Sequence, residues 1–95
     1  MKLTVEFLSL PNLTKIVGGK RVDLDLAAGR TVNDLLAELA RRYGPKLEQF
    51  LLDDEGQLDS IFKLIVNKEW LPPDEMDREL QDGDAVTIML LVGGG

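Results

Sequence analysis

The sequence contains no cysteine and no histidine, and these two absences exclude most of the usual catalytic chemistry. Without cysteine there is no disulfide, no thiolate nucleophile and no thiolate metal site. Without histidine the chain lacks the commonest general base and the commonest metal ligand, which excludes Ser-His-Asp catalysis and histidine-based metal catalysis. We therefore expect no metal site, no bound cofactor and no enzyme activity from this chain alone.

Basic residues are also scarce, with 11 Lys and Arg against 17 Asp and Glu and a net charge of −6. An acidic surface repels nucleic-acid phosphates, so we expect no nucleic-acid binding. The charge is compatible with a partner that has a basic groove, although most acidic domains are simply soluble. Residues 1–6 lack the apolar core of a signal peptide, and no apolar run is long enough to cross a membrane. The simplest expectation is a cytoplasmic protein that does not bind membranes.

A chain of 95 residues, 44% of them hydrophobic, is expected to fold as one small domain. Apolar and polar residues alternate in four segments, which is the pattern of strands with one face buried. The first two strands should form an antiparallel hairpin, because the residues between them, 11–20, are rich in turn and loop formers. The four segments are 3–7, 22–26, 62–66 and 85–92.

The third of these strands is expected in the middle of the sheet with both faces covered, because Ile61 and Ile65 are apolar in addition to the alternating residues. A tight turn at Asn67-Lys68 then leads to a short strand that contains Trp70. We expect Trp70, the only tryptophan, to pack partly against the end of the core. The alternative is an exposed tryptophan that anchors an interface.

One helix is predicted clearly, over residues 32–43. Thr31 is the expected N-cap, with Asp34 at the capping-box position. Gly44-Pro45 should end the helix, with Gly44 in a left-handed conformation, and a second short helix is expected at 46–52. A hairpin, one amphipathic helix and further strands make a two-layer α+β fold. The apolar stripe of the helix consists of Val32, Leu35, Leu36, Leu39, Ala40 and Tyr43.

Acidic residues cluster at two predicted turns, and we interpret them as solvated turn residues. Asp53-Asp54-Glu55 precedes Gly56, while Asp82 and Asp84 flank Gly83, where an Asp-Gly pair favours a turn with positive φ. Acid–base catalysis would need carboxylates that project into a cleft. The spacing also does not resemble an EF-hand loop.

Three glycines, Gly93, Gly94 and Gly95, follow the apolar run Leu90-Leu91-Val92. Ordering three glycines costs conformational entropy, so a frayed end is one interpretation. The other is a functional tail, which without side chains can pass through a narrow channel and present the α-carboxylate of Gly95 to an ATP-using active site. We expect residues 1–92 to form the domain and residues 93–95 to form a flexible tail.

The predicted last strand is apolar on both faces, and one helix can cover only one of them. We therefore expect an exposed apolar patch that docks a partner, formed by Leu90, Leu91 or Val92 with Phe7 nearby. Phe7 is also expected to contribute to the core. In the alternative, loops cover the second face.

Four stretches of the sequence, in order and spacing, resemble the ubiquitin-like β-grasp sulfur carriers, and among these the small subunits of molybdopterin synthase. The resemblance extends over essentially the whole chain. It implies a β-grasp fold with a mixed sheet of four to five strands packed on one main helix. The stretches are Phe7-Leu8 to Gly18, Gly29 to Gly44, Ile65-Val66-Asn67-Lys68, and Leu80-Gln81-Asp82-Gly83-Asp84-Ala85-Val86 to Gly94-Gly95.

The resemblance implies that Gly95 is the reacting residue and that its carboxylate becomes a thiocarboxylate. A ubiquitin-activating-type enzyme would adenylate the carboxylate with ATP, and a sulfur donor would then displace AMP. The large subunit of molybdopterin synthase would receive the tail, through Gly93 and Gly94, and transfer the sulfur to a pterin precursor. Family members often have prolines before the tail, where this chain has Leu90-Leu91, and two final glycines where this chain has three.

The sequence leaves three alternatives open. The carrier could serve thiazole, amino-acid or tRNA thiolation instead of molybdopterin synthesis. It could be a ubiquitin-like modifier that is attached to lysines of other proteins. It could also be an interaction module whose glycines are inert.

Overall fold

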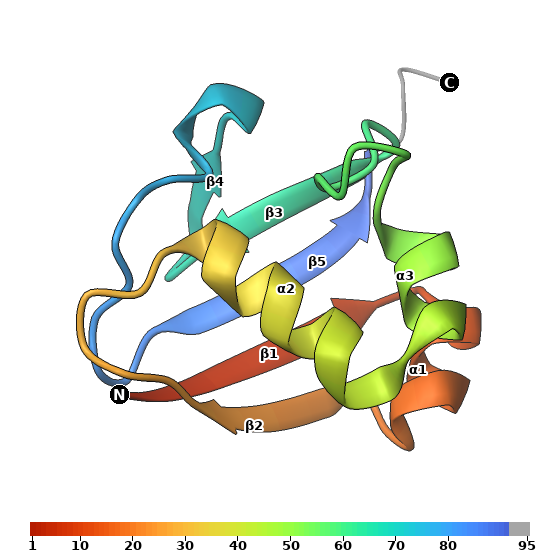
Figure 1. Cartoon of the computed structure of the whole chain (residues 1–95), viewed down its shortest axis with the longest axis horizontal. Helices are drawn as coiled ribbons and strands as arrows, with labels where there is room; N and C mark the ends of the chain where they lie inside the picture. The colour runs from red at the N-terminus through yellow and green to blue at the C-terminus, as the bar shows by residue number, and fades with distance from the viewer. Residues whose placement is uncertain (92–95) are drawn as a thin grey trace.

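Residues 1–91, the part of the chain that the computed structural model describes, form a mixed five-stranded sheet with a long helix packed across one face (Figure 1). The strands lie in the order β2-β1-β5-β3-β4. The α+β prediction is confirmed. The strands are β1 (Lys2–Leu8), β2 (Arg21–Asp25), β3 (Phe62–Val66), β4 (Glu69–Leu71) and β5 (Ala85–Leu90). The helices are α1 (Pro11–Val17), α2 (Val32–Tyr43), α3 (Pro45–Leu51) and the 3₁₀ helix η1 (Pro73–Glu75).

The parallel pair β1 and β5 is the centre of the sheet, and the other neighbouring strands are antiparallel. In β1, Val5 lies opposite Val22 of β2 and opposite Val86 of β5. All three valines are buried, as the alternation of apolar and polar residues predicts. The predicted antiparallel pairing of the first two strands is therefore confirmed, and β5 runs through the middle of the molecule.

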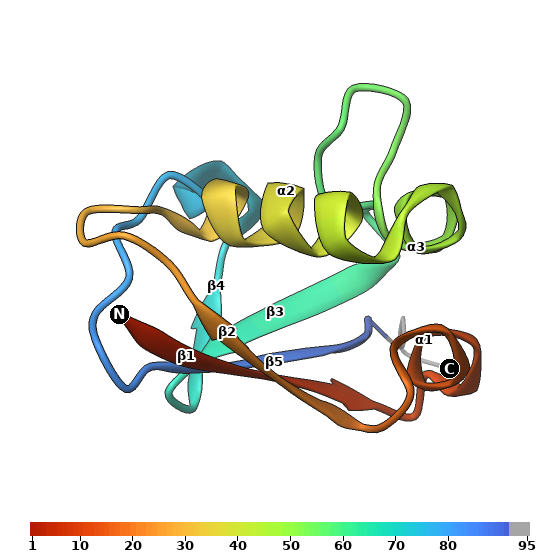
Figure 2. The same ribbon diagram turned by 60° about the horizontal axis from the view of Figure 1, so that its bottom comes forward.

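The hydrophobic core lies between the sheet and α2. Val32, Leu35, Leu36 and Leu39 of the predicted helical stripe are buried against it. Burying one leucine side chain contributes about 2 kcal/mol, so this stripe anchors α2 firmly. Figure 2 shows α2 and α3 on the same side of the sheet, whereas no helix of residues 1–91 covers the opposite face. None of the helices in this part of the chain has the length and apolarity needed to span a bilayer.

The ends of α2 confirm one cap and correct the other. The backbone N–H of Asp34 donates to Thr31 Oγ1 at 3.3 Å, and the Thr31 N–H donates to Asp34 Oδ2 at 2.8 Å, which completes the predicted capping box. Gly44 has a positive φ of 82°, but its ψ of −165° is extended and not left-handed helical. A proline disfavours helical ψ values in the residue before it, so Pro45 accounts for this difference. The chain then enters α3, the predicted second helix.

Residues 11–17 form the helix α1, so the prediction of a loop across 11–20 is wrong there. Pro11 begins the helix at its first turn and Gly18 ends it with φ 86°. Proline at the start and glycine after the end are typical of helix boundaries as well as of loops. Leu13 is buried, and Ile16 and Val17 pack against the core at helical spacing.

Three further expectations about the strands are corrected. The face of β3 away from α2 is not fully covered: Ile61, just before it, is exposed, and Ile65 is half-buried. Trp70 lies on the edge strand β4 with 54% of its surface exposed and is not among the residues packed against the core, which agrees with the alternative of an exposed tryptophan and not with partial packing at the end of the core. The sheet has a single layer of helices, which cannot cover both faces. The last strand was expected to extend over residues 85–92, but within the described residues β5 ends at Leu90.

Candidate functional site

The central strand β5 fixes the position from which the glycine tail departs. Its last residue, Leu90, lies opposite Phe62 at the start of β3. Beyond the strand, the backbone N–H of Leu91 still donates to the carbonyl oxygen of Ile61 at 2.7 Å. The chain is thus held in place up to Leu91. The expected site residues Val92, Gly93, Gly94 and Gly95 lie outside the described residues, as does the expected domain boundary at 92.

Exposed apolar side chains surround this departure point. Leu90 is 41% exposed and Leu91 is 52% exposed, so both apolar side chains are accessible as expected. Leu8, the last residue of β1, and Ile61, which precedes β3, are exposed at the same end of the sheet. We call Leu8, Ile61, Leu90 and Leu91 the tail-root patch. Exposed apolar groups of this kind mark a docking surface when they lie together.

Phe7 does not belong to the tail-root patch, so the prediction that it contributes to an exposed surface is wrong. It is fully buried and lies opposite Ile88 of β5 on the side of the sheet that α2 covers. Successive strand residues point to opposite faces. Leu8, and not Phe7, is therefore the exposed apolar residue at the end of β1.

The bare face of the sheet extends the apolar surface away from the tail. Ile65 of β3 lies between Trp70 of β4 and Thr87 of β5 in the register of the strands. On the same face, Lys63 lies opposite Met89, which in turn lies opposite Leu8. A partially apolar face with one lysine thus continues from β4 to the tail-root patch.

Two of the predicted acidic turns have structural roles. Asp53 Oδ1 accepts hydrogen bonds from the backbone N–H groups of Glu55 at 2.9 Å and Gln57 at 3.0 Å, which confirms a solvated turn. Gly83 has φ 86°, as the Asp-Gly pair predicts. Across residues 1–91, no three acidic side chains are grouped in a way that would hold a metal ion.

Asp84 is buried, so the interpretation of this residue as a solvated turn residue is wrong. Its side chain is 8% exposed, and Oδ1 accepts from Asn67 Nδ2 at 2.6 Å while Oδ2 accepts from the Gln81 N–H at 2.7 Å. Asn67 Oδ1 also accepts from the Ala85 N–H at 2.8 Å. A buried carboxylate is stable when its oxygens are hydrogen-bonded. This Asn67–Asp84 clasp ties the turn between β3 and β4 to the start of β5.

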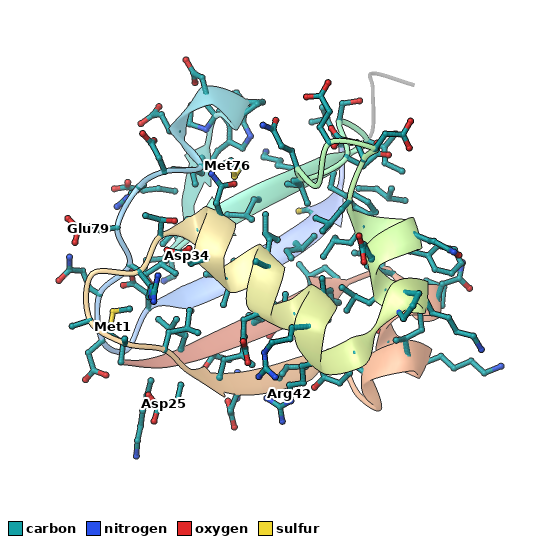
Figure 3. All side chains as sticks on the ribbon, in the orientation of Figure 1. Met1, Asp25, Asp34, Arg42, Met76 and Glu79 are labelled. Carbon is teal, nitrogen blue, oxygen red and sulfur yellow. The ribbon has the colours of Figure 1, made fainter. Side chains whose placement is uncertain are left out.

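Among the described residues, shifted pKa values occur on the exposed side of α2. The backbone N–H of Thr31 lowers the pKa of Asp34, which lies near the first turn of α2 (Figure 3). One turn later, the hydrogen bond from Arg41 lowers the pKa of Glu38, and the same bond raises the pKa of Arg41. These shifts come from a helix cap and a surface ion pair, which are structural features.

Comparison with known proteins identifies the family of the chain. The sequence profile of the ThiS family matches residues 12–95, which is most of the chain and includes the glycine tail. The chain belongs to the ThiS family. This ubiquitin-like family consists of small sulfur carriers that are not catalysts themselves. No curated protein matches the sequence significantly.

Solved structures similar to this ThiS-family chain have the same fold. SAMP1 from Haloferax volcanii is 23% identical, with 100% of each chain covered and a TM-score of 0.81. A chain of the BexX/CysO complex from Amycolatopsis orientalis is 28% identical over 98% of this chain and 99% of that chain, with a TM-score of 0.73. A Pyrococcus furiosus protein assigned as subunit 1 of the molybdopterin converting factor is 25% identical over 95% and 97%, with a TM-score of 0.70. The predicted β-grasp fold is confirmed.

Proposed function

We propose that the α-carboxylate of Gly95 becomes a thiocarboxylate and that the chain donates this sulfur in the synthesis of molybdopterin, for a molybdenum or tungsten cofactor. It would act as the small subunit of a molybdopterin-synthase-type complex. The observation on which the proposal rests is that a ThiS-family β-grasp domain anchors Leu91 among exposed apolar residues, and only Val92 separates Leu91 from three glycines in the sequence. The similarity to a molybdopterin converting factor subunit over nearly the whole chain supports the choice of pathway.

The chemistry requires activation, because a free carboxylate is a poor electrophile. In the adenylating partner, a carboxylate oxygen of Gly95 attacks the α-phosphorus of ATP and pyrophosphate leaves. A donor that supplies sulfur at the oxidation level of sulfide then attacks the carbonyl carbon, and AMP leaves with the former carboxylate oxygen. The carrier binds no cofactor in this scheme, since ATP is used by the activating enzyme.

The domain positions the tail while the partners supply the catalytic groups. Both the adenylating enzyme and the large subunit must accept the same tail, so the tail-root patch is their shared docking surface. Gly94 has no β-carbon to obstruct a narrow channel around the reacting residue. Gly93 lengthens the arm that connects this channel to Leu91.

Deletion of Gly95 tests the role of the tail. The carrier is incubated with its activating enzyme, ATP and a sulfur donor, and its intact mass is measured. The mass of the full chain should increase by the difference between a sulfur and an oxygen atom, whereas the mass of the shortened chain should not change. Gly19→Ala is a matched control, because a β-carbon there would meet only the Arg21 carbonyl oxygen, at 3.9 Å. Sulfur uptake by the shortened chain would refute the proposal.

A carrier for a different pathway is the second candidate, because the chain from the BexX/CysO complex is at least as similar as the molybdopterin converting factor subunit. Affinity capture with the tagged full chain separates the two. Recovery of a molybdopterin synthase large subunit supports the first pathway. Recovery of a different sulfur-accepting enzyme without that subunit supports the second.

A further inference from the structure

A groove of about 640 Å³ opens beside the last described residue of the chain. It lies at the sheet edge, where β3 and β4 extend past α2, and its floor is apolar: Phe62 and Leu64 of β3 and Leu71 of β4. Leu58 and Met76 add apolar atoms from the two sides, and Leu91 lines the end nearest the tail. A volume of this size accommodates one or two large side chains.

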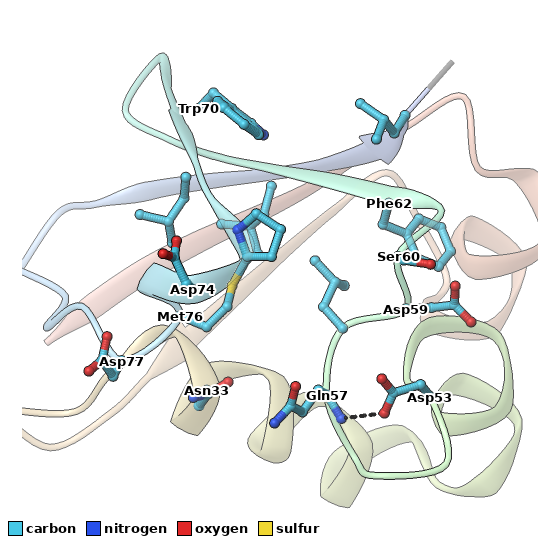
Figure 4. A pocket seen from close by; sticks show the side chains of 15 residues that line it. Asn33, Asp53, Gln57, Asp59, Ser60, Phe62, Trp70, Asp74, Met76 and Asp77 are labelled. Carbon is cyan, nitrogen blue, oxygen red and sulfur yellow. Dashed lines mark hydrogen bonds between the residues drawn. The ribbon is translucent and has the colours of Figure 1, made fainter. Parts of the chain in front are cut away.

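The rim of the groove has charge of only one sign. Figure 4 shows Asp74 and Asp77 on one side and Asp53 and Asp59 on the other. No lysine or arginine is among the lining residues in the described part of the chain. Asp53 and Asp59 each accept backbone hydrogen bonds within their own loop. Four carboxylates around an apolar floor match a ligand that has an apolar body and cationic ends.

Both walls are held by backbone hydrogen bonds, so the groove exists before a ligand binds. In the loop before β3, the Asp53 N–H donates to the Gln57 carbonyl at 2.7 Å, and the Asp59 N–H donates to the Leu51 carbonyl at 2.9 Å. On the opposite wall, the Asn33 N–H of α2 donates to the Met76 carbonyl at 2.9 Å. A preformed site reduces the conformational cost of binding.

We infer that this groove binds a segment of the adenylating enzyme, and that the segment presents an apolar or aromatic side chain flanked by lysine or arginine. The inference rests on the proposed function: a partner that encloses the residues after Leu91 must also cover the end of the groove that Leu91 lines. The acidic rim would then select a basic partner surface and increase the rate of association.

Other occupants fit the charge less well. Residues 92–95 could extend about 14 Å at most, which is far enough to enter the groove, but their terminal carboxylate would meet four aspartates. A second copy of the chain has a net charge of −6 and presents the same acidic rim. A basic segment of the partner is the occupant that the rim attracts.

Charge reversal at the rim tests this inference. The assay is ATP–pyrophosphate exchange by the activating enzyme, measured at a series of concentrations of the full-length carrier. The variant Asp74→Lys/Asp77→Lys should raise the KM for the carrier about tenfold at low salt with little change in kcat, because rim charges act mainly on association. The matched control Asp54→Lys/Glu55→Lys makes the same change in net charge on the neighbouring loop, outside the groove lining, and its KM should stay within about twofold of wild type.

Each other result contradicts the inference. Equal KM values for the two variants would mean that the groove has no specific role. A wild-type oligomer that dissociates only in the rim variant would assign the groove to a second copy. Changed NMR amide signals at Asp74 and Asp77 on deletion of residues 93–95 in the free carrier would assign the groove to the tail. Absence of exchange with wild type would refute the proposed function itself, together with the partner assigned to the groove.

Discussion

At the scale of single residues, Asp84 is the side chain whose environment differs most from what its sequence context indicates. Asp-Gly-Asp suggests an exposed turn, and Gly83 does adopt the expected positive φ. The partner that buries Asp84 is Asn67, 17 positions earlier, and both residues of the Asn67-Lys68 turn have positive φ. Local propensity predicts each turn separately, but it does not predict the hydrogen bond between Asn67 and Asp84 that joins the two turns.

Replacing Asp84 with alanine should lower the free energy of unfolding by about 1–3 kcal/mol, because the Asn67 amide and the Gln81 N–H would lose their acceptor in a partly buried place. Urea denaturation followed by circular dichroism measures the change. Asp54→Ala, at an exposed loop position, should remain within about 0.5 kcal/mol of wild type. A loss for Asp84→Ala as small as that of the control would show that the clasp does not stabilise the fold.

At the scale of secondary-structure elements, hydrophobic period and capping residues predicted α2 almost completely. The apolar stripe, the Thr31–Asp34 capping box and the stop before Pro45 are all local features. The shorter α1 was missed because Pro11 and Gly18 are compatible with both a loop and a short helix. Its helical state depends on burial of Leu13 in the core, which is a tertiary effect.

The capping box of α2 predicts a dependence of stability on pH. The hydrogen bond from the Thr31 N–H lowers the pKa of Asp34 in the folded state, so folding favours the ionised carboxylate. The stabilisation is fully present above the pKa of Asp34 in the unfolded chain, which is about 4. It is lost as the pH falls through the lower pKa of Asp34 in the folded state. The stability difference between wild type and Asp34→Asn should therefore be largest near neutral pH and shrink below about pH 4. Urea denaturation at a series of pH values measures it, and a constant difference would contradict the assignment.

At the scale of the whole molecule, the sequence identified the tail and the apolar strand before it, but not the surface around them. Leu8 and Ile61 join Leu90 and Leu91 only because β1, β3 and β5 are adjacent in the sheet. The acidic groove likewise combines two loops that are distant in sequence. Strand order and register determine both surfaces, and neither follows from the local patterns that predict the elements.

The tail-root patch predicts that Leu91→Asp weakens partner binding more than it weakens the fold. Leu91 is 52% exposed, so an aspartate there should change the free energy of unfolding by less than about 1 kcal/mol. Because binding would remove water from the introduced carboxylate, the affinity for the adenylating enzyme should fall by about tenfold or more. Calorimetric titration measures the affinity. Phe50→Asp on α3, at a similarly exposed apolar residue outside the patch, is the control, and equal affinities for the two variants would exclude the patch as the docking surface.

The most direct measurement is tandem mass spectrometry of the C-terminal peptide after incubation with the activating enzyme, ATP and a sulfur donor. We predict that one oxygen is replaced by sulfur, that the change is located on Gly95, and that it requires ATP. Sulfur found elsewhere in the chain, or no replacement at Gly95 under conditions in which the enzyme consumes ATP with this carrier, would contradict the proposed role of the tail.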